Sequence, residues 1–187
     1  MIDFRKARFV TSAPDLAARP KLELPAILMV GRSNVGKSTL INALLGQKIA
    51  FSSKKAGKTK LLNYFEVDSR FYLVDSPGYG STSYATLSTI NFAKMMESYV
   101  KEKSLKAIVL LLDLRRDLGK DDESFIRYLE NTGVKILPVL TKMDQMNQSD
   151  KHKASVRAHA LDIHEYLESD LSTKSVAKIR SAIANLL

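Results

Sequence analysis

Short apolar runs alternate with stretches of helical periodicity along the chain. The runs at residues 26–30, 107–113 and 135–142 are nearly unbroken, which is typical of strands covered on both faces. Two further runs, 61–67 and 70–75, flank Asp68 and Ser69, a pair that suits the turn of a β-hairpin. Helical spacing is found in residues 38–46, 83–103, 122–133, 149–161 and 174–187.

This alternation predicts an α/β fold. We expect a mostly parallel six-stranded sheet with one antiparallel edge strand and helices on both faces. Pro138 is unfavourable in a central strand, because proline lacks the N–H that the sheet ladder uses. Ligands of such sheets bind beyond the carboxyl ends of the strands. The loops that follow the apolar runs are therefore where we expect functional residues.

The loop after the first long apolar run reads GRSNVGKST and fits the pattern G-x-x-x-x-G-K-[ST]. Its glycines let backbone N–H groups turn toward a phosphate, and the next helix points its positive end at the same anion. Lys37 can reach the outer phosphates, and the Ser38 hydroxyl can bind Mg²⁺ directly. A glycine-rich turn with an exposed lysine is the alternative. The pattern predicts a single P-loop nucleoside triphosphatase domain, with nucleotide contacts from Gly31, Arg32, Ser33, Asn34, Val35, Gly36, Lys37, Ser38 and Thr39.

A second motif, TKMD at residues 141–144, distinguishes guanine from adenine. The Asp144 carboxylate can accept hydrogen bonds from N1–H and the amino group of guanine, and adenine offers no such pair of donors. Thr141 opens the motif, and Lys142 can pack its stem along the base. An exposed charge at a strand end is the alternative. The motif predicts GTP and GDP as ligands.

The segment DSPG, residues 75–78, adds a metal ligand and a phosphate contact. Asp75 can hold Mg²⁺ through a water molecule, and the Gly78 N–H can contact the γ-phosphate. Ser76 and Pro77 lie between them and are included among the predicted nucleotide contacts. A segment of this kind is ordered by the triphosphate and released on hydrolysis.

A polar segment, SSKKAGKTK at residues 52–60, is a candidate for the first switch. Thr59 can bind Mg²⁺ directly when the γ-phosphate is present, and Gly57 and Lys58 precede it among the predicted contacts. A threonine in a polar loop without any such role is the alternative. We assign Lys37, Thr59 and Gly78 as the catalytic residues.

The charge of the chain favours an anionic partner, most simply a nucleic acid. The formal net charge is +9. Lysines 54, 55, 58 and 60 could couple the nucleotide state to RNA affinity, or they could simply offset bound phosphate. The chain contains no cysteine, and it shows neither a signal peptide nor an apolar run long enough to span a membrane. We expect neither a membrane partner nor DNA specificity.

Several stretches together resemble one family, the EngB/YsxC-type ribosome-assembly GTPases. They are GRSNVGKSTLINALLG, KIAFSSKKAGKTKLLNYFEV, FYLVDSPGYG, LLDLRRDLGKDD and VLTKMD, and the lead-in RFVTSAPDLAARPKLELP is similar as well. The resemblance covers nearly the whole chain. It implies a lead-in segment, residues 1–24, that packs on a GTP-binding domain of residues 25–187. One departure is DSPGYGSTS, where the family often has D-L-P-G-Y-G-Y-A-K.

The resemblance also implies a biological setting. It indicates a monomeric, cytoplasmic bacterial protein that binds GTP, GDP and Mg²⁺. Its implied partner is the large ribosomal subunit or its precursor, with its rRNA, and family members are linked to cell division and septation.

Three residue assignments depend on this resemblance. Tyr79 stands where Ras-like proteins have a glutamine, which implies slow intrinsic hydrolysis. The equivalent of Asn34 helps to hold K⁺ in similar GTPases, although a role in loop shape alone is equally open here. The last nucleotide-contacting loop is matched best by Ser172 and Thr173, with Ser169 as a rival alignment.

Two other functions remain open. A P-loop kinase of small molecules would share the loop and the sheet, but it would need neither TKMD nor DSPG. It would also need an arginine-bearing lid, which we do not find in the sequence. A cell-division scaffold that binds GTP with little turnover would keep the whole nucleotide site.

Overall fold

The structure is a computed structural model that describes residues 2–21, 24–50, 61–80 and 85–187, except for the side chains of residues 85–91. Its strands are β1 (Ala7–Ala13), β2 (Ala26–Gly31), β3 (Leu62–Val67), β4 (Phe71–Asp75), β5 (Leu105–Leu112), β6 (Lys135–Leu140) and β7 (Leu167–Glu168). Its α-helices are α1 (Lys37–Leu45), α2 (Ala85–Tyr99), α3 (Lys120–Glu130), α4 (Gln148–Ala160) and α5 (Thr173–Asn185).

The strands form one sheet in the order β1-β3-β4-β2-β5-β6-β7. β4, β2, β5, β6 and β7 are parallel, and β3 is antiparallel to both β4 and β1. The predicted α/β fold with a mostly parallel sheet is therefore confirmed. The sheet has seven strands and not the expected six, because the five strands located in the sequence are joined by β1 from the N-terminal segment and by β7 at residues 167–168. The antiparallel strand β3 is consequently covered by β1 instead of lying at the edge.

Two local predictions can be followed in the backbone. Asp68 and Ser69 both have positive φ, 51° and 53°, as a tight hairpin turn between β3 and β4 requires. Pro138 lies within β6, opposite Leu110 of β5. β7 pairs with β6 only at Val139 and Leu140, so β6 has a neighbour on one side alone at Pro138, where a proline is tolerated.

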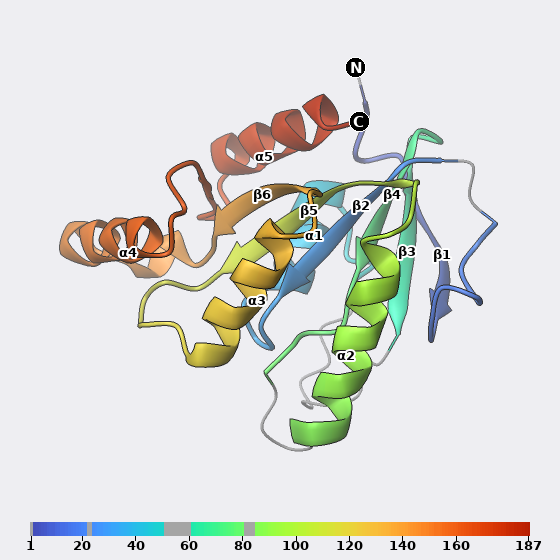
Figure 1. The fold of residues 1–187 in the computed structure, drawn as a ribbon. Helices are drawn as coiled ribbons and strands as arrows, with labels where there is room; N and C mark the ends of the chain where they lie inside the picture. The colour runs from blue at the N-terminus through green and yellow to red at the C-terminus, as the bar shows by residue number, and fades with distance from the viewer. Residues whose placement is uncertain (1, 22–23, 51–60, 81–84) are drawn as a thin grey trace.

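Helices cover both faces of the sheet, as expected (Figure 1). α1 and α5 lie on one face and share a core with alternate residues of β2, including Ile27 and Met29. α2 and α3 lie on the other face and pack against Leu28 and Val30. Every residue of β2 is buried, which explains its unbroken apolar run. None of the described helices combines the length and apolar character needed to cross a bilayer.

Candidate nucleotide site

Four loops meet at the carboxyl edge of the sheet, around the P-loop at residues 31–38. The P-loop follows β2, Asp75 ends β4, Asp113 follows β5, and residues 141–144 follow β6. β2 lies between β4 and β5, and β6 is next along the sheet. The sheet order thus places the predicted phosphate loop beside both the DSPG and the TKMD segments, which are far apart in the sequence.

The P-loop backbone takes a shape that depends on its two glycines. A Cβ atom on Gly31 would lie 2.8 Å from Cγ1 of Val35, too close for any other residue. Gly36 precedes α1 with a φ of 104°, in the left-handed region that glycine favours. The N-cap residue Gly36 has no side chain that could cap α1, so within the described part of the chain the first N–H groups of the helix remain available to an anion.

On the β4 side, the segment 75–79 lies directly against the P-loop. The Lys37 ammonium pairs with the Asp75 carboxylate. The Ser33 N–H donates to the carbonyl oxygen of Tyr79 at 2.9 Å. A Cβ on Gly78 would lie 2.9 Å from Cα of Ser33, so the two chains can approach this closely only with glycine at position 78.

On the β6 side, two residues of TKMD hold the outside of the same loop. The Thr141 hydroxyl donates to the carbonyl oxygen of Val35 at 2.8 Å. The Lys142 ammonium donates to the carbonyl oxygen of Asn34 at 2.8 Å and to Asp113 at 2.9 Å. Lys142 therefore has charged and polar partners of its own, and its stem crosses the P-loop instead of extending into solvent.

Asp113 is a carboxylate that the sequence reasoning did not assign. Partial burial alone would raise its pKa, but hydrogen bonds from Arg115 and Lys142 outweigh that effect and lower the pKa to about 2. Arg115 reaches Asp113 at 2.8 Å and also contacts Gln145. Asp113 is therefore ionised at neutral pH and fixes Lys142 in place. Its place directly after an apolar strand is the signal that could have identified it.

The structure brings Ser169, not Ser172, against the TKMD loop. Ser169 follows β7, its N–H donates to Leu140 at 2.8 Å, and its carbonyl oxygen accepts the N–H of Met143 at 3.2 Å. Ser172 instead caps α5 by accepting the N–H of Ser175. Within the described part of the chain, no hydrogen bond joins Ser172 or Thr173 to residues 141–144. β7 has two residues, too few to show a periodicity in the sequence.

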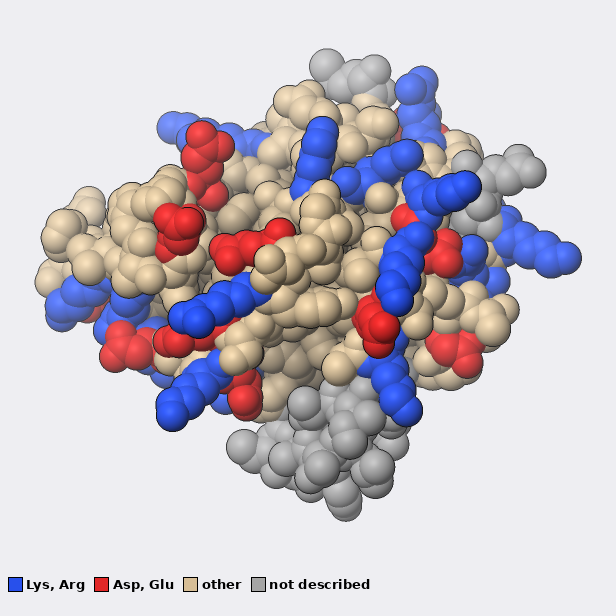
Figure 2. Space-filling view, viewed as in Figure 1, with Lys and Arg blue, Asp and Glu red and all other residues tan. Residues whose placement is uncertain are grey.

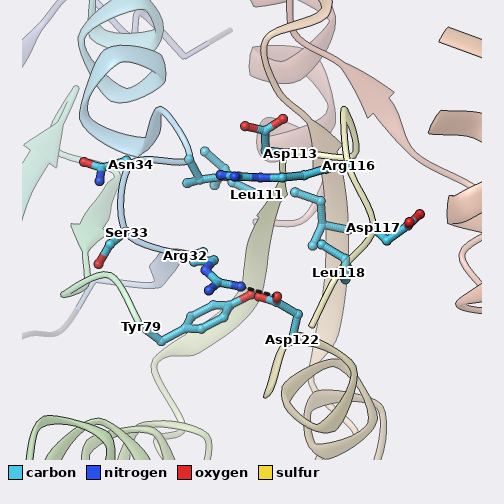
Figure 3. A pocket seen from close by; sticks show the side chains of 12 residues that line it. Arg32, Ser33, Asn34, Tyr79, Leu111, Asp113, Arg116, Asp117, Leu118 and Asp122 are labelled. Carbon is cyan, nitrogen blue, oxygen red and sulfur yellow. Dashed lines mark hydrogen bonds and ion pairs between the residues drawn. The ribbon is translucent and has the colours of Figure 1, made fainter. Parts of the chain in front are cut away.

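A small hollow beside the P-loop is closed by Arg32, Tyr79 and Asp122, which turn toward one another in Figure 3. Arg32 donates to the buried Asp122 carboxylate at 2.7 Å. The Tyr79 ring packs on Phe125 and Phe92, with centroids 4.7 and 5.7 Å away. Burial, followed by the nearby Asp122 carboxylate, raises the pKa of the Tyr79 phenol. Tyr79 is therefore a packed, neutral side chain, and Asp122 is a site residue that the sequence reasoning missed.

The remaining predicted residues are placed as follows. Asp144 is exposed in a 3₁₀ turn, Met143–Gln145. Ser38, in the first turn of α1, and Pro77 are half-buried, Thr39 is exposed, and the buried Ser76 hydroxyl donates to Met29 at 2.8 Å. Gly57, Lys58 and Thr59 lie outside the described residues, as do lysines 54, 55 and 60.

Comparison with known proteins identifies the family. Residues 26–142 match the family described as 50S ribosome-binding GTPase. The chain is 38% identical over 184 residues to the probable GTP-binding protein EngB of Solibacter usitatus, covering 97% of this chain and 96% of that protein. The chain belongs to the EngB family of GTP-binding proteins. The resemblance seen in the sequence is thereby confirmed, and EngB membership argues against the small-molecule kinase.

Solved structures share the fold of this EngB-type chain. One crystal structure of a probable EngB gives a TM-score of 0.60 at 20% identity, over 86% of this chain and 97% of that one. Toc33 of Arabidopsis thaliana in complex with Mg²⁺ and GMPPNP gives a TM-score of 0.61 at 13% identity, over 88% and 85%. At such identities the similarity shows the fold alone.

Proposed function

We propose that this EngB-type protein is a slow GTPase that acts as a nucleotide-dependent switch in assembly of the large ribosomal subunit. It acts as a monomer in the bacterial cytoplasm, and its loss affects cell division and septation through failed ribosome assembly. One observation carries the switch. The P-loop is contacted by segment 75–79 on one side and by residues 141–142 on the other. A ligand bound in the P-loop therefore affects the positions of both segments.

The phosphates are bound by backbone N–H groups of the P-loop and of the first turn of α1. When the nucleotide binds, the Lys37 ammonium leaves its ion pair with Asp75 and binds the phosphate oxygens. The Asp144 carboxylate selects guanine by accepting hydrogen bonds from the N1–H and the amino group of the base. The backbone at Ser169 completes the base site, because it is hydrogen-bonded to the TKMD loop. This assignment replaces Ser172 and Thr173 in the base site.

Mg²⁺ fits the residues present. Ser38 and Asp75 flank Lys37 from α1 and β4 and offer oxygen ligands of the kind that Mg²⁺ prefers. In our assignment Ser38 and Thr59 bind the ion directly and Asp75 binds it through water. The bound ion neutralises charge on the outer phosphates. The role of this chain is to orient those phosphates with Lys37 and the Gly78 N–H.

Slow hydrolysis follows from the position of Tyr79. Hydrolysis needs a group that orients the attacking water beside the γ-phosphate. The Tyr79 side chain packs against Phe92 and Phe125 and faces Asp122, so it does not serve that role. Activation then comes from a partner or from K⁺ near Asn34, whose side chain is exposed.

Sedimentation of cell extracts tests this proposal. Extracts are fractionated on sucrose gradients with GDP or with a non-hydrolysable GTP analogue, and the protein is located by antibody. We expect it in fractions of the large subunit or its precursors, and more of it with the analogue. Co-fractionation with septal membranes instead, in both nucleotide states, would support the division scaffold and contradict the proposal.

A further inference from the structure

Basic side chains also follow the amino edge of the sheet, at the opposite end of the strands from the nucleotide site. Arg70 precedes β4, Lys106 is the second residue of β5, and Lys135 begins β6. All three side chains are exposed. Because the amino ends of parallel strands share one edge, these residues belong to the same side of the molecule.

Lys103 extends this row between β4 and β5. It lies in the turn after α2, where the Ser104 carbonyl oxygen accepts the N–H of Ala26 at 2.7 Å and ties the turn to the start of β2. The sheet order β4-β2-β5-β6 therefore places the basic residues side by side. From β4 to β6 the row spans about 14 Å, at about 4.8 Å between neighbouring strands. We call Arg70, Lys103, Lys106 and Lys135 the basic edge.

Neighbouring acidic residues leave the basic edge positive. Glu97 pairs with Lys101 at 3.1 Å, and Glu102 pairs with Arg19 at 2.5 Å. Glu130, at the end of α3, is a further negative charge a few residues before Lys135. Among the described residues, no carboxylate lies within 4.0 Å of the ammonium groups of Lys103, Lys106 or Lys135. Figure 2 shows Lys and Arg side chains on the surface around the C-terminal end of α2, with some Asp and Glu side chains among them.

The bound nucleotide does not explain this charge. Lysines that offset phosphate must lie near it, whereas the basic edge lies a full strand length away, at the far end of β5 and β6. Surface charges this far apart are largely screened at physiological salt. The charge therefore indicates a second anionic contact.

We propose that the basic edge binds the phosphate backbone of RNA in the large ribosomal subunit, with equal strength in the GTP and GDP states. This inference rests on the proposed function. An exposed row of lysines suits a phosphate backbone, which is read by charge without base specificity. Membrane-surface segments combine basic residues with an apolar face. The exposed large hydrophobic side chains of the described chain are on other elements, at Phe9, Tyr128, Val156, Leu171 and Leu187.

A charge-reversal variant of full-length protein tests the proposal. The variant carries Lys103→Glu, Lys106→Glu and Lys135→Glu, and its matched control carries Lys151→Glu, Lys153→Glu and Lys178→Glu on α4 and α5. Both variants change the net charge equally. Binding to purified large ribosomal subunits is measured by co-sedimentation, with GDP and with a GTP analogue, from about 50 to about 200 mM salt.

We expect the edge variant to lose at least about tenfold in affinity in both nucleotide states, and the slope of log K against log salt to become shallower by about 2. The control should lose less than about threefold. Unchanged GDP affinity of the edge variant shows that it is folded, and a matching Lys→Gln triple should show a smaller loss of the same kind.

Four results would overturn the inference. Equal losses in the edge variant and the control would mean that only net charge matters. If the edge variant bound subunits as tightly as wild type, the basic edge would not be an RNA-binding surface, and the proposed function would be unaffected. Loss of binding to phosphatidylglycerol vesicles without loss of subunit binding would assign the edge to membranes. If wild type bound no subunits in either nucleotide state, the proposed function and this inference would both fail.

Discussion

Arg32 of the P-loop donates a hydrogen bond to Asp122, a buried carboxylate in the first turn of α3, at 2.7 Å. The same carboxylate accepts the N–H of Gly119 at 3.0 Å. Gly80, with a φ of 72°, lies against the guanidinium, since a Cβ there would be 3.2 Å from Nε of Arg32. The Arg32–Asp122 pair thus connects the phosphate loop, the segment that follows DSPG and helix α3.

We expect Asp122→Ala to loosen the P-loop and to accelerate GDP release. The change removes a helix cap and leaves Arg32 without its partner, but the half-exposed guanidinium regains water. The free energy of unfolding should fall by about 1–2 kcal/mol. Urea denaturation measures the stability, and stopped-flow fluorescence of labelled GDP measures release. Asp121→Ala, in the same helical turn but exposed, is the control. It should change neither the stability nor the rate of GDP release by much. Equal effects of the two variants would contradict the connection.

The two candidate serines near the base should differ in what they stabilise. Ser172→Ala removes the N-cap of α5 and should lower the free energy of unfolding by about 1 kcal/mol. Ser169→Ala should be nearly neutral, because its buried hydroxyl has no hydrogen-bond partner among the described residues. Thermal unfolding without GDP measures the stability of each variant, and the shift of the unfolding temperature with GDP measures its GDP affinity. A larger loss of GDP affinity for Ser172→Ala than for Ser169→Ala would restore Ser172 to the base site.

Asp113 should make stability depend on pH in the acid range. Its pKa in the folded protein is about 2, below the ordinary value of 3.8. A carboxylate with a lowered pKa stabilises the fold fully above its ordinary pKa, and this contribution is lost as the pH falls from about 4 to about 2. The shift sets an upper limit of roughly 2 kcal/mol, and we expect about 1 kcal/mol because Arg115 and Lys142 are partly solvated.

Comparison of wild type with Asp113→Asn by urea denaturation measures this contribution. The difference in free energy of unfolding should be largest near neutral pH and should shrink between about pH 4 and about pH 2. Glu130→Gln, which changes an exposed carboxylate at the end of α3, serves as the control. A difference that stays constant over this range would contradict the assigned role of Asp113.

The parts of the site that the sequence revealed are those encoded by local patterns. The P-loop could be predicted because its glycines, Lys37 and the flanking strand and helix are contiguous. The five central strands could be predicted because their apolar runs are long enough to recognise, whereas their order in the sheet comes from the structure. Asp122 escaped notice because its partner Arg32 is ninety residues away, and such a pairing depends on packing. The position of Ser169 beside residues 141–144 is hidden in the sequence for a similar reason, since the two residues of β7 carry no pattern and only their pairing with β6 places them.

Asp144→Asn should change which base the protein binds. The carboxylate would become an amide that no longer accepts from both guanine donors, whereas xanthine presents an oxygen where guanine has its amino group. We expect GDP affinity to fall by about 10²-fold, the size of one or two charge-assisted hydrogen bonds, and XDP affinity to rise. Isothermal titration calorimetry with GDP, XDP and ADP measures this. Asp150→Asn, in the first turn of α4, is the control. Unchanged preference for GDP in Asp144→Asn would remove Asp144 from the base site.

Potassium should accelerate GTP turnover if Asn34 supplies a ligand to the ion. Asn34 has an exposed side chain and a φ of 65°, and Lys142 donates to its carbonyl oxygen, so the backbone is fixed while no hydrogen bond from the described residues engages the side-chain amide. A cation there would supply the positive charge that otherwise comes from an arginine finger. We expect turnover at least about tenfold faster in K⁺ than in Na⁺ at equal ionic strength, and loss of this difference in Asn34→Ala. Asn34→Gly keeps the left-handed backbone without the amide and separates ion binding from loop shape. Equal turnover of wild type in the two salts would leave Asn34 with loop shape as its role.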